Sequence, residues 1–143
     1  MDNSIPRKGD FFIFFVFLFV PLPAHTQTIM ALVQETKIYK DMYSLLRLIL
    51  HARKQFDKFY RYSFAERMVM TAIDCCELLQ RANSNKEYAP RFLNEFSVKF
   101  SSLRLMLMIC RDEQQIDTRK FADILELANS IGKQATGWRN SFA

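Results

Sequence analysis

Apolar residues recur every three or four positions along most of the chain after Met30, a spacing that places side chains on one face of a helix. In residues 35–56 the apolar positions advance by four and three in alternation, which predicts a helix packed at a shallow angle against its neighbours. This seam consists of Ile38, Met42, Leu45, Ile49, Ala52 and Phe56. Leu46, Leu48 and Leu50 widen the apolar surface, so we expect this helix to have more than one neighbour.

A second helix is predicted over residues 63–83. Ser63 and Glu66 have the spacing of a capping box, in which the hydroxyl and the carboxylate each accept a hydrogen bond from a free backbone N–H. The apolar stripe that follows consists of Phe64, Met68, Ala72, Cys75, Leu79 and Ala82. The turn-rich stretch "NSNKEYAP" then predicts the end of this helix.

A third helix is predicted from about Pro90 to Asp112, with proline early in the helix, where its missing N–H costs least. Its seam consists of Phe92, Phe96, Phe100, Leu103, Leu107 and Cys110. The segment "LRLMLMIC" carries one charge in eight residues. A helix that is apolar nearly all round is buried on several sides, so we expect another subunit to cover part of it.

A fourth helix is predicted to begin after a capping residue, Asp117. Its stripe consists of Phe121, Ile124, Leu125, Ala128, Ile131, Ala135 and Trp138. Gly132 and Gly137 permit the close approach of another backbone near the end of this helix. Short connections between four helices of similar length predict an all-α fold, an antiparallel up-down-up-down four-helix bundle, which we assign to residues 30–143.

The first 29 residues differ from the rest. "FFIFFVFLFV" is a run of ten apolar residues, six of them Phe, which is too short to cross a bilayer as a helix. Arg7 and Lys8 before it resemble the start of a signal peptide, but Asp10 and the sequence "PLPAHT" do not fit one well. We prefer to interpret residues 1–29 as an extension outside the fold, upstream of a true start at Met30. A signal or anchor, or a structural role, are the alternatives.

The amino-acid composition limits the classes of function that this chain can have. With 3 Gly and 4 Pro in 143 residues, helices are favoured and a Gly-rich phosphate-binding loop is excluded. The odd number of cysteines, 3, does not suit a secreted disulfide framework, so we expect a reducing, cytoplasmic location. The net charge is +5, and residues 1–29 hold two basic and two acidic residues, so the positive excess belongs to the helical domain.

No catalytic or metal-binding constellation is found in the sequence. Cys75 and Cys76 are adjacent and point about 100° apart on a helix, so both cannot bind one metal, and small buried packing residues are the simpler interpretation. His51 has no acidic or nucleophilic neighbour one turn away. The carboxylate pairs lack the Glu-x-x-His motif of di-metal bundles. We expect no enzyme activity, no cofactor and no metal.

Basic residues give the strongest functional signal. The segment "RKQFDKFYRYSFAER" interleaves cations with aromatic residues at a corner between two helices, which suits binding of a phosphate backbone and exposed bases. Its candidate binding residues are Arg53, Lys54, Lys58, Arg61 and Arg67. The alternative is a solvated corner whose aromatic rings pack inward.

Two further candidate binding residues, Arg104 and Arg111, lie seven positions apart on the most apolar helix. A charge in such surroundings needs a partner, which is a carboxylate, a neighbouring subunit or an anionic ligand. An ion pair inside the fold is the simplest of these.

Three segments in this order and spacing carry a family resemblance: "YRYSFAERMVMTAIDCCELLQRAN", "VKFSSLRLMLMICRD" and "ILELANSIGKQATGW". Together they resemble the accessory variability determinant proteins of diversity-generating retroelements. The resemblance implies an antiparallel four-helix bundle that forms a homo-oligomeric ring of five with a basic surface. It also implies a non-enzymatic partner of a reverse transcriptase that binds the enzyme and its template RNA, with no membrane association.

The resemblance can be followed at single positions. Arg67 stands where the family has a basic residue early in the second helix, and Leu103–Arg104 and Arg111–Asp112 match its third helix. Gly137–Trp138 matches the closing Gly-Trp. Met108 replaces a frequent arginine, which weakens one stripe of positive charge, and Thr136 replaces a glycine.

A sibling family is encoded within ribosomal RNA intervening sequences and has an Asn-Ile-Ala-Glu-Gly motif where this chain has "LLQRANSN". A structural or interaction bundle of that type, with no nucleic-acid role, is the alternative function.

Overall fold

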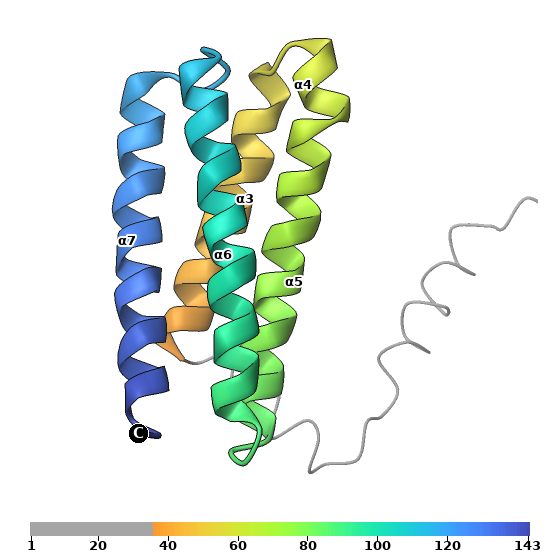
Figure 1. The fold of residues 1–143 in the computed structure, drawn as a ribbon. Helices are drawn as coiled ribbons and strands as arrows, with labels where there is room; N and C mark the ends of the chain where they lie inside the picture. Colours follow the sequence, from red (N-terminus) through yellow and green to blue (C-terminus); the bar gives the residue numbers. More distant parts are fainter. Residues whose placement is uncertain (1–35) are drawn as a thin grey trace, which may run out of the picture.

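The computed structural model describes residues 36–143, and these are all-helical with no β-strand (Figure 1). The elements in chain order are α3 (Lys37–Ala52), a 3-10 turn η1 (Arg53–Gln55), α4 (Lys58–Tyr62), α5 (Phe64–Ser84), α6 (Ala89–Asp112) and α7 (Thr118–Asn140). The predicted all-α class and the four long helices are therefore confirmed. The short α4 was not predicted.

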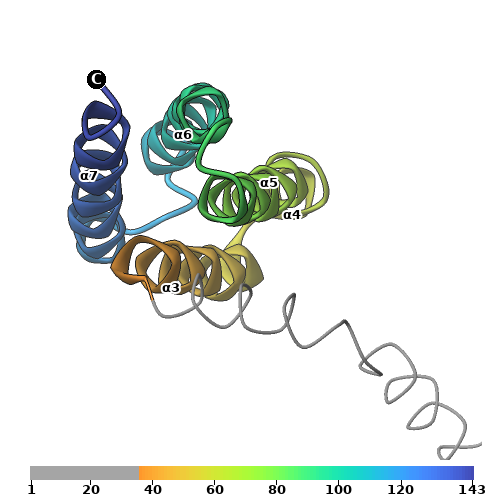
Figure 2. The ribbon, with the colours of Figure 1, turned by 90° about the horizontal axis from the view of Figure 1, so that it is seen from below.

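The four long helices lie side by side around a common centre (Figure 2). Helix α3 packs against α5 and α7, and α6 packs against the same two helices, so each long helix has two neighbours. The α5–α6 connection lies at one end of this bundle-like arrangement, and the connections from α3 to α5 and from α6 to α7 lie at the other (Figure 1).

The buried residues form a hydrophobic core cluster to which all four long helices contribute. Every seam residue predicted for the first helix is buried, from Ile38 to Phe56. In the other helices the predicted stripes are buried except at their edges, where Phe64, Phe92, Leu125 and Trp138 are only partly buried. These stripes were predictable because a helix presents the same face every three to four residues.

Some apolar residues stay outside this core. Leu48 and Leu50 on α3 are exposed, and so are Leu105 and Met108 on α6. The expected second neighbour of the first helix is confirmed, because α3 packs against both α5 and α7 and Leu46 packs partly buried against the core. The cover expected from another subunit over the third helix, where Leu105 and Met108 are exposed, stays a prediction.

Of the two helix caps predicted from the sequence, one is confirmed and one is wrong. Asp117 caps α7, because its carboxylate accepts a hydrogen bond of 2.9 Å from the backbone N–H of Lys120. The capping box at Ser63 is wrong: its side chain makes no cap bond, and its hydroxyl donates backward to the carbonyl of Phe59. The reason is α4, which continues helical structure up to Ser63 and offers that carbonyl one turn before it.

Among residues 36–143, no backbone lies close to the space that the glycines of α7 leave open. A side chain at Gly132 would meet the guanidinium of Arg104 at 3.7 Å, and one at Gly137 would meet nothing within 4 Å. Gly132 therefore leaves room for an arginine side chain and not for another backbone.

The interpretation of residues 1–29 as an extension, and the start of the domain at Met30, lie outside the described residues. Within residues 36–143, none of the helices has the length and apolar character needed to cross a membrane.

Two leucines one turn apart on α3 are expected to contribute very differently to the free energy of unfolding. Leu45 is fully buried whereas Leu48 is exposed. We expect Leu45→Ala to lower the free energy of unfolding by about 3 kcal/mol through lost burial and a cavity, and Leu48→Ala by less than about 1 kcal/mol. Urea denaturation followed by circular dichroism measures both values. Equal losses for the two variants would contradict the assignment of the seam.

Candidate nucleic-acid interface

Helical structure is interrupted at the corner between α3 and α5. After η1 the backbone becomes extended at Phe56 and Asp57, and α4 follows for five residues. Phe56 anchors the corner because its side chain is 1% exposed and belongs to the core. An interrupted helix leaves backbone carbonyls and N–H groups without their usual partners, so side chains must supply them.

Arg61 supplies the partners for two carbonyls. Its guanidinium donates to the backbone oxygens of Lys54 at 2.9 Å and Phe56 at 3.0 Å, where α3 and η1 end. A cation at this position also faces the negative end of the helix dipole. Arg61, a candidate binding residue from the sequence, is therefore held by the corner itself.

The connection between α6 and α7 supports the corner from the other side. Gln115 accepts a hydrogen bond from the Asp57 N–H at 2.8 Å and donates to the Asp57 carboxylate at 3.0 Å. Tyr60 donates from its hydroxyl to Glu113 at 2.9 Å, and this bond raises the pKa of the phenol. These contacts fasten α4 to the carboxyl end of α6.

The outward side of α4 carries exposed aromatic rings. Phe59 and Tyr62 are 71% and 63% exposed and lie three positions apart, hence on one face of the helix. The ring of Phe59 meets Tyr60 edge-on at 5.2 Å, which fixes its orientation from one side. The alternative of rings packed inward applies to Phe56, Tyr60 and Phe64.

Four of the candidate cations lie in the same part of the sequence as these rings, and none of them pairs with an acid of the described residues. Lys54, Lys58 and Arg67 are exposed and Arg53 is half-buried. None of the ion pairs within residues 36–143 involves these side chains. We call Arg53, Lys54, Lys58, Phe59, Tyr62 and Arg67 the cationic corner.

The two arginines of α6 have partners within the fold. Arg104 donates to the side-chain oxygen of Asn129 on α7 at 2.9 Å, a neutral partner that leaves its charge uncompensated. Arg111 pairs with Asp112 at 2.7 Å, and its guanidinium lies 4.7 Å from the ring centre of Phe121. The structure thus holds Arg111 by an acid and a ring, as the simplest interpretation predicted.

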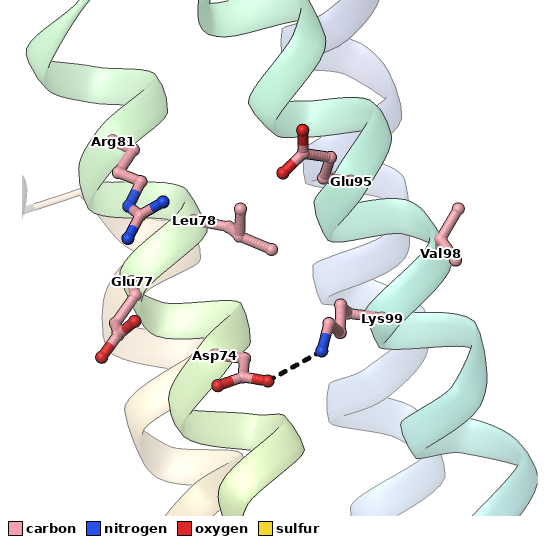
Figure 3. A pocket seen from close by; sticks show the side chains of 7 residues that line it. All are labelled: Asp74, Glu77, Leu78, Arg81, Glu95, Val98 and Lys99. Carbon is pink, nitrogen blue, oxygen red and sulfur yellow. Dashed lines mark hydrogen bonds and ion pairs between the residues drawn. The ribbon is translucent and has the colours of Figure 1, made fainter.

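A second polar region, not foreseen from the sequence, is a groove of about 410 Å³ between α5 and α6 (Figure 3). Its lining residues are Asp74, Glu77, Leu78, Arg81, Glu95, Val98 and Lys99. Lys99 bonds to Asp74 at 2.9 Å, and this hydrogen bond raises the pKa of the lysine. Because acids and bases alternate across the groove, it has no single sign of charge to attract a polyanion. One sequence could not reveal it, since the register between two helices is not visible in either helix alone.

The thiols are packing residues with no catalytic environment. Cys75 and Cys110 are buried and Cys76 is half-buried, and all three are free. Burial raises the pKa of Cys75 to about 12 and that of Cys76 and Cys110 to about 11. Cys110 contacts the sulfur of Met68 at 4.0 Å.

His51 is exposed on α3, in a groove where Lys120 and Asp123 of α7 face it. In the described part of the chain, no group of three or more His, Cys, Asp or Glu side chains could hold a metal ion.

Comparison with protein-family models and with curated proteins finds no match to this chain. The function must therefore be argued from the chain's own residues.

The reactivity of the thiols tests whether the cysteines are buried packing residues. Because each pKa is at least about 11, the thiolate fraction at pH 8 is about one thousandth or less. We expect the folded chain to react with iodoacetamide at least about 100-fold more slowly than the chain in guanidinium chloride. Mass spectrometry after timed labelling measures this. Rapid labelling of Cys75 in the folded chain would contradict a packing role.

Proposed function

We propose that this chain is a non-enzymatic, nucleic-acid-binding accessory protein that uses the cationic corner to bind RNA. The observation that carries the proposal is the combination of two exposed rings on one short helix with four cations that form no ion pair within residues 36–143. Lysine and arginine attract the phosphate backbone, and aromatic rings stack on bases of any sequence.

The support beneath the corner strengthens this proposal. Arg61, Gln115 and Tyr60 hold α4 through side-chain hydrogen bonds to η1 and to the α6–α7 connection. A surface held in place in the free protein loses less conformational entropy when a ligand binds. These residues thus act as positioning residues for Phe59 and Tyr62.

The charge of the whole chain favours the same ligand. A net charge of +5 gives a positive field that attracts polyanions at low salt and is screened at high salt. Several copies in one assembly would multiply this field, which is the physical role of the ring of five that the family resemblance implies.

The partner enzyme rests on the resemblance alone. On that basis we propose that the chain serves a reverse transcriptase and its template RNA in a diversity-generating retroelement, in the cytoplasm.

For the fold we infer that the long helices alternate in direction as an antiparallel up-down-up-down bundle. The support for this is that successive connections lie at opposite ends (Figure 1).

A structural bundle without a nucleic-acid role, as in the ribosomal intervening-sequence proteins, is the second candidate. The observation that favours it is that Arg61, Arg104 and Arg111 already have partners within the fold. The two candidates differ in whether the remaining cations bind RNA.

The salt dependence of binding tests the proposal on the full chain. We expect binding to a fluorescent single-stranded RNA to weaken steeply as the salt concentration rises. The double variant that carries Lys54→Gln and Lys58→Gln should show a shallower slope of log K against log salt, by about 0.7 for each phosphate contact that is lost. Lys86→Gln with Lys133→Gln is the matched control, because both lysines are exposed and lack acidic partners. No binding at low salt, or equal losses in both double variants, would contradict a role for the corner.

The reverse transcriptase role has a separate test. We expect the neighbouring genes to encode a reverse transcriptase beside a near-repeat pair of template and variable regions, and the purified enzyme to be retained by the immobilised full chain. An intervening sequence of ribosomal RNA as the gene's location would instead support the structural bundle.

A further inference from the structure

The carboxyl end of α3 and the turn η1 face α7 across a groove of about 320 Å³. Sites for small molecules in proteins begin at about this size, roughly 300 Å³. Lys54 of the cationic corner lines the groove, so the groove adjoins the surface that we propose binds RNA. An RNA strand on that surface therefore has room to place one base in the groove.

Part of the groove lining is apolar. Ala52 and Ile124 belong to the buried core, and Leu48 is exposed. Leu48 and Ala52 lie one turn apart on α3, whereas Ile124 comes from α7. Two helices thus supply aliphatic side chains to one site, against which a planar ring is removed from water.

One polar contact joins the two sides of the groove. Lys120 of α7 donates to the side-chain oxygen of Gln55 at 2.8 Å, and its ammonium also pairs with Asp117 at 3.3 Å. The charge of Lys120 is therefore compensated within the chain, and its contact holds the Gln55 side chain. Because the oxygen of Gln55 accepts this bond, the NH₂ group of Gln55 remains available as a donor.

The groove also contains an acid, Asp123, three positions after Lys120 on the same face of α7. None of the ion pairs and side-chain hydrogen bonds within residues 36–143 involves Asp123 or His51, which also lines the groove. The carboxylate of Asp123 therefore offers two acceptor oxygens to a ligand. A carboxylate repels phosphate, so its place beside Lys54 indicates a ligand that brings hydrogen-bond donors as well as negative charge.

Guanine is the RNA base whose donors match this acid. Its Watson–Crick edge carries two adjacent donors, N1–H and the 2-amino group, which a carboxylate accepts side by side. Next to them the O6 oxygen accepts from an amide NH₂ such as that of Gln55. Adenine and cytosine each offer one amino donor beside an acceptor nitrogen. Uracil places its one N–H between two carbonyl oxygens, which a carboxylate repels.

From these observations we propose that the groove between α3 and α7 is a guanine subsite of the RNA-binding surface. The carboxylate of Asp123 accepts from N1–H and the 2-amino group, the ring lies against the aliphatic side chains, and Lys54 attracts the adjoining phosphate. This inference rests on the proposed function, because the base belongs to the RNA strand on the cationic corner.

Binding of two single-stranded RNAs to the full chain at low salt tests the subsite. One strand contains only uridine, and the other has one guanosine at the middle of the same strand. We expect the guanosine to strengthen binding roughly tenfold, a typical effect of a base contact with two hydrogen bonds. Asp123→Asn should remove this preference and still bind both strands, because an amide presents one acceptor in place of two.

Glu126→Gln is the matched control. Glu126 is exposed on the same helix, forms none of the ion pairs within residues 36–143 and does not line the groove. Both variants remove one negative charge from α7, so they change the general attraction for RNA alike. We expect Glu126→Gln to keep the preference for guanosine.

The outcomes distinguish the subsite from the proposed function. Salt-dependent binding of the uridine strand without a gain from guanosine, or a preference that Asp123→Asn leaves unchanged, would overturn the subsite alone. If neither strand binds, the proposed function fails, and guanosine 5′-monophosphate then tests the groove by itself. We expect this nucleotide, and not adenosine 5′-monophosphate, to shift the imidazole NMR signals that are missing in His51→Gln. The absence of that shift would overturn the subsite.

Discussion

Each of the four long helices must bury one apolar stripe, and this requirement determines where everything else can lie. The seams from Ile38 to Phe56 on α3, and their counterparts on α5, α6 and α7, meet in one core that holds almost no polar group apart from Thr71. Charged side chains are therefore confined to the outer surface and the ends. Because cations exceed acids by five in the whole chain, that surface cannot be neutralised by internal ion pairs.

The distribution of the uncompensated charge follows from the break between α3 and α5. A continuous helix would satisfy its own backbone, but the interrupted corner requires Arg61 and Gln115 to complete its hydrogen bonds. Arg61 and Tyr60 of α4 are used inward, whereas Phe59 and Tyr62 of the same short helix face solvent. The same local irregularity thus stabilises the corner and exposes its rings beside lysine and arginine.

The stripes, the Asp117 cap and the inert cysteines were predictable from the sequence because each depends on spacing within one helix. The false capping box at Ser63 arose because α4 was not recognised, and a five-residue helix has too little periodicity to reveal itself. The contacts of Arg104 with Asn129 and of Tyr60 with Glu113 join segments 25 and 53 positions apart. Such contacts depend on the register between helices, which no single stretch of sequence encodes.

The central claim is that the cationic corner is the surface that contacts RNA. Ultraviolet crosslinking of the full chain to single-stranded RNA, followed by mass spectrometry of the crosslinked peptides, tests it most directly, since aromatic rings stacked on bases are favourable sites of photochemical attachment. We expect the crosslinks to concentrate at Phe59 and Tyr62 and to disappear as salt is raised. Crosslinks that map to the opposite end of the helices, around Tyr88, with none on α4, would contradict it.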